Sequence, residues 1–146
     1  MSIKQALFRV GLVIYVLSFF LVATGDPKGW VGRMRGYECA YSVVRAALTT
    51  TPFSPNSDDY APPLLYVSIL ASALINPTFL VHVVLTFLKP MPQITRGLKI
   101  ALPSMIPFCW VVFRSLEIYP REGHVLWVIG MLLVLFSSSK QAQTPD

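Results

Sequence analysis

Residues 64–88 read LLYVSILASALINPTFLVHVVLTFL, and this stretch decides the fold of the chain. It holds about 25 residues without Asp, Glu, Lys or Arg, and it is followed directly by Lys89 and Pro90. As an α-helix it would be about 37 Å long, whereas the hydrocarbon core of a bilayer is about 30 Å thick. A water-soluble helix of this length has a polar face, and this one has only scattered Ser, Thr, Asn and His. The stretch is therefore predicted to be a transmembrane helix.

The polar side chains of this helix recur at spacings that bring them to one side of it. Because an unpaired amide or imidazole in hydrocarbon is costly, this stripe should face protein rather than lipid. Pro77 cannot donate to the carbonyl of Ala73, so a neighbouring group must satisfy that carbonyl. The stripe has two interpretations, helix–helix hydrogen bonding or a cofactor site that uses His82. Its members are Ser68, Ser72, Asn76, His82 and Thr86.

The composition extends the membrane interpretation to the whole chain. Hydrophobic residues make up 54% of the 146 residues and charged residues only 13%, well below the level of about 25% in soluble domains. The apolar residues form four blocks, so the predicted fold is all-α, with four transmembrane helices in an antiparallel bundle. Residues 1–139 form one membrane domain, and residues 140–146 form a polar tail. The helices are expected at residues 7–24, 64–88, 98–117 and 123–139.

The connections between these blocks add a surface helix and several interfacial residues. Residues 37–48 place Ala and Val at helical spacing but are too short and too charged to span, which predicts an amphipathic helix at the membrane surface. Trp30 and Trp127 fall where aromatic anchors sit at a membrane interface. Arg114 and Glu117 end the third block at a spacing that allows an ion pair. The short turn after them predicts that the third and fourth helices are joined most tightly.

The charges indicate topology rather than a nucleic-acid partner. The net charge is +5, but no basic cluster is present, and the charges lie at the ends of the apolar blocks. Short segments with basic residues and almost no acids precede the first block, follow the second and follow the fourth. Placing these segments in the cytoplasm predicts N-in and C-in topology. Cys39 and Cys109 are predicted to be free, since a disulfide would require one of them to leave the bilayer.

Three landmarks resemble a loose group of small, uncharacterised bacterial four-helix membrane proteins. They are Gly36–Ala40 (GYECA) after the first block, Asn76–Leu80 (NPTFL) in the second, and Trp127–Ser138 in the last. In that group a G-[WY]-x-C-type turn follows helix 1 and an N-P-x-F element lies in helix 2. The resemblance implies the four-helix architecture and a location in the bacterial inner membrane, and it carries no assigned activity.

Three functions remain open from the sequence. The absence of a catalytic cluster and the small size favour a non-catalytic accessory or scaffold subunit, with the lipid bilayer and other membrane subunits or a second copy as partners. An alternative is a subunit that binds haem or a chlorophyll-type pigment through His82. A small transporter or channel component is the other alternative, although no carboxylate lies within the apolar blocks to couple ions. Neither an enzyme nor a metal site is expected.

Overall fold

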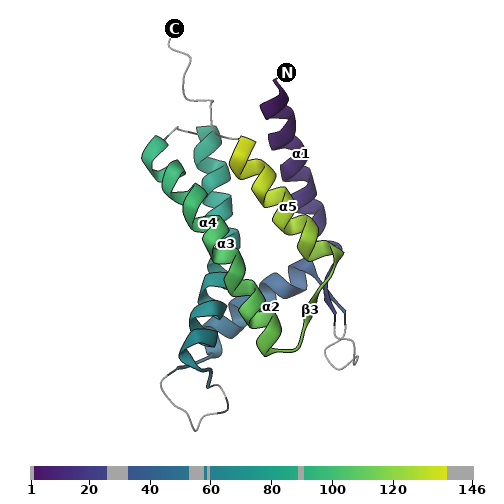
Figure 1. The fold of residues 1–146 in the computed structure, drawn as a ribbon, viewed down its shortest axis with the longest axis vertical. Coiled ribbons are helices and arrows are strands. Elements are labelled where there is room, and N and C mark those ends of the chain that lie inside the picture. The colour runs from purple at the N-terminus through teal and green to yellow at the C-terminus, as the bar shows by residue number, and fades with distance from the viewer. Residues whose placement is uncertain (1, 26–32, 53–57, 59, 89–90, 138–146) are drawn as a thin grey trace.

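The computed structural model describes residues 2–25, 33–52, 58, 60–88 and 91–137 (Figure 1). Within these residues the chain forms five helices and three short strands. In order they are α1 (Ile3–Ser18), β1 (Val22–Gly25), β2 (Met34–Arg35), α2 (Gly36–Thr49), α3 (Pro63–Leu88), α4 (Pro92–Ser115), β3 (Tyr119–Pro120) and α5 (Glu122–Ser137).

The helices form two packed pairs that share one core. α1 packs most extensively on α5, and α3 packs on α4, while α2 lies across the lower part of α3 (Figure 1). Phe79 of α3, Leu102 of α4 and Met131 of α5 are fully buried where the pairs meet. Tyr15 joins α1 to this core through its ring contact with Phe79, with centroids 4.3 Å apart.

The start of α2 docks on the turn that follows α1. The backbone N–H of Gly36 donates to the carbonyl of Leu21 at 3.1 Å, and that of Tyr37 donates to the carbonyl of Phe19 at 3.0 Å. The last carbonyls of α1 itself, those of Val16, Leu17 and Ser18, accept from the N–H groups of the same turn. A Cβ atom on Gly36 would lie 2.7 Å from the carbonyl oxygen of Ser18, so only glycine permits this approach.

A small antiparallel sheet ties three distant parts of the chain together. Its strand order is β2-β1-β3, with Val22 opposite Arg35 and Gly25 opposite Tyr119. The N–H of Arg121 extends the pairing by donating to the carbonyl of Ala23 at 2.8 Å. The sheet therefore holds the end of α1 against the starts of α2 and α5.

The backbones of α1 and α5 touch where two glycines face each other. A Cβ atom on Gly130 would lie 2.6 Å from the amide nitrogen of Tyr15, and one on Gly11 would lie 2.9 Å from the carbonyl oxygen of Gly130. Small residues allow helices to approach this closely, which is a common arrangement in membranes. The pair of glycines thus fixes how α1 and α5 pack.

The prediction of four transmembrane helices is wrong. Among the described residues only α3 and α4 are long and apolar enough to cross a membrane, over Pro63–Phe87 and Gln93–Ser115. α1 and α5 have 16 residues each. At about 24 Å such helices are shorter than the hydrocarbon core.

Two further details of the predicted architecture differ from the structure. Residues 22–24, expected at the end of the first helix, belong to β1, and the expectation included no sheet. The last helix packs mainly on α1 rather than on α4. The expected surface helix at 37–48 coincides with α2, whereas the polar tail 140–146 lies outside the described residues.

Candidate functional site

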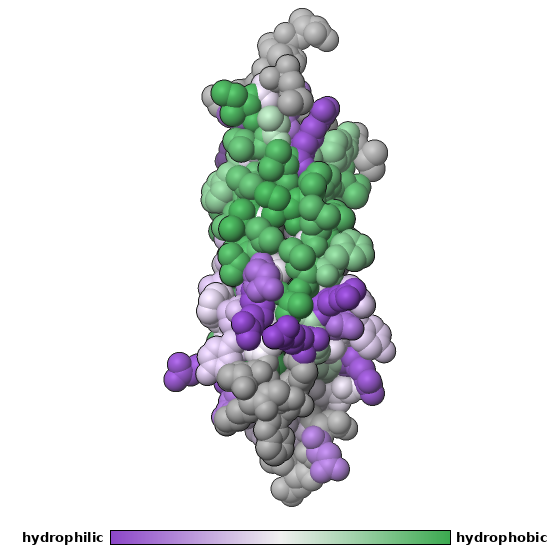
Figure 2. Space-filling view, turned by 90° about the vertical axis from the view of Figure 1, so that its right-hand side faces the viewer, coloured by the Kyte–Doolittle hydropathy of each residue, from purple (hydrophilic) through white to green (hydrophobic). Residues whose placement is uncertain are grey.

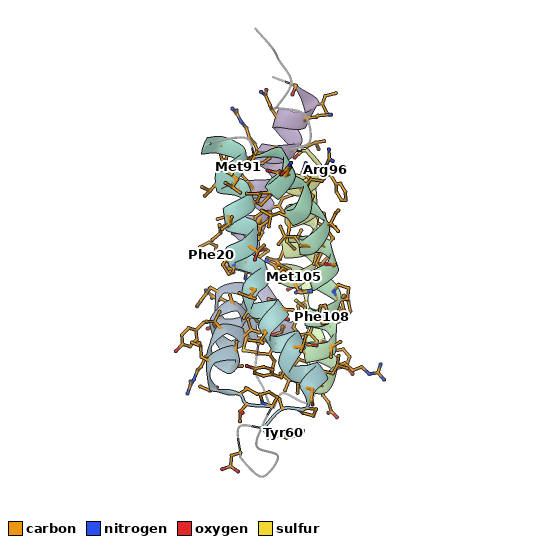
Figure 3. The ribbon with its side chains drawn as sticks, turned by 90° about the vertical axis from the view of Figure 1, so that its left-hand side faces the viewer. Phe20, Tyr60, Met91, Arg96, Met105 and Phe108 are labelled. Carbon is orange, nitrogen blue, oxygen red and sulfur yellow. The ribbon has the colours of Figure 1, made fainter. Side chains whose placement is uncertain are left out.

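A cavity of about 400 Å³ opens between α2, α3, α4, the start of α5 and β1. Its lining is mainly apolar, with Val43, Ile69 and Phe113 contributed by three different helices. Tyr60 also lines it, so the cavity lies toward the end of the molecule opposite Met91 and Arg96 (Figure 3). Its size and apolar character are typical of sites for small molecules.

Asn76 is the polar residue at which three helices meet on the wall of this cavity. Its Oδ1 accepts hydrogen bonds from the Tyr15 hydroxyl of α1 and from Nε1 of Trp127 on α5, both at 2.9 Å. An indole nitrogen can only donate, so the atom that faces it must be the amide oxygen. This fixes the orientation of the amide, and its NH₂ group makes no hydrogen bond within the described part of the chain.

His124 forms an aromatic wall of the same cavity. Its ring stacks on Trp127 with centroids 5.3 Å apart and meets Phe113 edge-on at 4.8 Å. It is 7% exposed, and its Nε2 has no hydrogen-bond partner among the described residues. Burial lowers the pKa of His124 to about 4, so the ring is neutral at ordinary pH.

Both cysteines line this cavity, and both are free. The prediction of free thiols is confirmed. The thiol of Cys39 lies 3.4 Å from the hydroxyl of Thr24. Burial raises the pKa of the Cys39 thiol, which keeps it protonated and weakly nucleophilic.

The predicted polar stripe of α3 divides into three kinds of residue. Ser68, Ser72 and Thr86 donate to the carbonyls four residues earlier in their own helix, at 2.7–2.8 Å. Asn76, next to Pro77, reaches other helices. His82 is fully buried in the core but is not part of the cavity lining. Use of His82 for haem or a pigment therefore stays a prediction, separate from this cavity.

The residues expected at the membrane interface also differ in their positions. Trp127 is 9% exposed and hydrogen-bonded in the core, so it is not an interfacial anchor. Arg114 is exposed near the end of α4. Glu117 lies just beyond that end with φ of 52°, a left-handed turn that ends the helical path. Trp30 lies outside the described residues.

Sequence reasoning missed the roles of Tyr15, His124 and Trp127 in this site. The sequence offered one indication of these roles: each side chain carries a polar atom that lies within or beside an apolar block and needs a hydrogen-bond partner there. No group of three or more His, Cys, Asp or Glu that could hold a metal ion occurs in the described residues. No family model, curated protein or solved structure matches the chain.

Proposed function

We propose that this chain is a non-catalytic integral membrane protein that binds a small, mostly apolar molecule in the cavity beside α2. The observation that carries the proposal is the cavity itself. It combines an apolar lining with the amide of Asn76, whose NH₂ group is unused by the described residues, and with the aromatic rings of His124 and Trp127. Few oriented polar groups on an apolar wall are the usual design of a small-molecule site.

The membrane placement rests on α3 and α4. Only 28% of the apolar window of α3 and 17% of that of α4 are buried inside the molecule, unlike the core helix of a soluble protein. Side chains such as Leu74, Leu80 and Trp110 are more than half exposed and would lie in lipid. On another face, Figure 2 displays a broad apolar belt, with hydrophilic residues gathered below it.

The charges support one orientation of these two helices. Lys4, Arg96 and Lys99 lie toward the end where α3 passes into α4, with Arg96 labelled there in Figure 3. Glu38 and Glu122 begin α2 and α5 toward the other end, where Arg35 and Arg121 also lie. The orientation therefore rests on the short segment 89–99, which has basic residues and no acid, and this orientation opens the cavity toward the outer side of a cytoplasmic membrane.

A second function, as an accessory subunit, is favoured by the outer face of α1. Val10, Val13 and Leu17 are each at least half exposed there. Such a row needs cover by lipid or by another protein. Light scattering in mild detergent tests it: a mass above that of one 16.3 kDa chain should fall in Val13→Asn.

Binding in the cavity can be tested with the neutral dye Nile red and two neighbouring substitutions in α2. Val43 lines the cavity, whereas Val44 is 43% exposed and does not. Val43→Trp should fill the cavity and weaken dye binding at least tenfold. Val44→Trp adds the same side chain on the outer face and should leave binding unchanged. Equal binding by the wild type and both variants in detergent would contradict the proposal.

A further inference from the structure

The polar residue on the cavity wall points to the chemistry of the ligand. We infer that the cavity selects a neutral, mostly apolar molecule with a carbonyl oxygen, held by hydrogen bonds from the amide of Asn76 beside the aromatic rings of Trp127 and His124. This inference rests on the proposed function, because it names the ligand class of the same site.

The first step concerns Asn76, which can offer only donors. Both hydrogen bonds that reach it from Tyr15 and Trp127 end on Oδ1. The two N–H bonds on Nδ2 remain, and Asn76 is half-buried on the cavity wall. A donor in such a place binds an oxygen acceptor and gains nothing from a hydrocarbon.

The second step concerns His124, which lies on the same wall. Trp127 connects the two residues, since its Nε1 donates to Asn76 and its ring stacks on His124. The Nε2 atom of His124 is fully buried and does not face the cavity, so the ring contributes a flat aromatic surface beside Asn76 rather than a hydrogen bond.

The third step concerns charge. Among the described residues that line the cavity there is no Lys or Arg, and the one acid is Asp58 at the exposed loop. An anionic ligand would find no counter-charge among these residues and would lose its hydration. A carbonyl oxygen accepts hydrogen bonds and has no charge, so it matches the unused N–H bonds of Asn76.

The test compares benzophenone with its hydrocarbon analogue, in which a methylene group replaces the carbonyl oxygen. Each compound displaces Nile red from the full-length protein in detergent, with partition into empty micelles measured and subtracted. The wild type should bind benzophenone at least tenfold more tightly than the analogue. Asn76→Asp keeps an acceptor for Tyr15 and Trp127 but removes the NH₂ group, so this preference should fall to about twofold or less. His124→Phe keeps an aromatic ring on the wall and should leave it intact, as should Val44→Trp on the outer face.

The outcomes separate this inference from the proposed function. Equal binding of the two compounds by the wild type, with Val43→Trp blocking both, would overturn the carbonyl assignment and leave the proposed function standing. A carbonyl preference that survives in Asn76→Asp would also overturn the assignment. Failure of the wild type to bind Nile red or either compound would reject the proposed function itself. The comparison of benzophenone with its analogue on the wild-type protein is informative even if a variant fails to fold.

Discussion

At the scale of single residues, His124 links the stability of the protein to pH. An unfolded histidine takes up a proton near pH 6.5, whereas burial lowers the pKa of folded His124 to about 4. Between these values the unfolded state binds more protons, so stability is complete above the unfolded pKa and is lost as the pH falls. A drop from about pH 7.5 to about pH 5 should cost about 2 kcal/mol through this residue.

Thermal unfolding in detergent at a series of pH values measures this effect. His124→Phe keeps a ring against Trp127 and Phe113 but removes the titrating group, so its melting temperature should depend less on pH. An identical pH dependence in the variant and the wild type would contradict the role given to His124.

Asn76 shows which part of a site can be predicted at this scale. Its place on the polar side of a long apolar helix indicated that it would hydrogen-bond to other helices. Its partners could not be predicted, because Tyr15 lies 61 positions and Trp127 lies 51 positions away along the chain. His124 stands at the start of the last apolar block, and only the packing of α5 brings it to the cavity.

At the scale of secondary-structure elements, the contact between Gly11 and Gly130 controls the packing of α1 on α5. Gly130→Ala places a methyl group 2.6 Å from the Tyr15 nitrogen, so the helices must separate. Overpacking of this kind costs about 1–3 kcal/mol. Gly97→Ala in α4 is the matched control, because its added Cβ has no atom within 4 Å.

The control should change stability in the opposite direction. Alanine is a better helix former than glycine by about 0.5–1 kcal/mol, so Gly97→Ala should raise the melting temperature while Gly130→Ala lowers it. Circular dichroism melting in detergent compares the two. A Gly130→Ala variant as stable as the Gly97→Ala variant would show that the helices do not depend on this contact.

The ends of α1 and α5 explain why the number of spanning helices was predicted wrongly. Residues 7–24 have Arg9 as their one charged residue, and no proline interrupts the segment where α1 ends. Beyond Ser18 the start of α2 docks on the carbonyls of Phe19 and Leu21, which is a tertiary contact. Local pattern predicted helix through residues that form β1. By contrast, α3 was predictable, since its length and apolar content are properties of the segment alone.

At the scale of the whole molecule, the orientation in the membrane is open to a labelling experiment. Asp58 and Gln93 are exposed near opposite ends of α3 and α4. In a chain whose two cysteines are replaced by alanine, Asp58→Cys should react with an impermeant thiol reagent in intact cells. Gln93→Cys should react only after the cells are permeabilised, because the proposed orientation places the connection between α3 and α4 in the cytoplasm. The reverse pattern would require the cavity to face the cytoplasm.

The pairing of α1 with α5 also determines when the protein can assemble during synthesis. α1 ends at Ser18, and its principal partner begins at Glu122, more than one hundred residues later. At typical rates of translation the ribosome needs roughly 5 to 20 s to make that interval. During this time α3 and α4 can already pair, whereas α1 waits with its glycine face uncovered. α1 therefore completes its packing only after α5 has emerged.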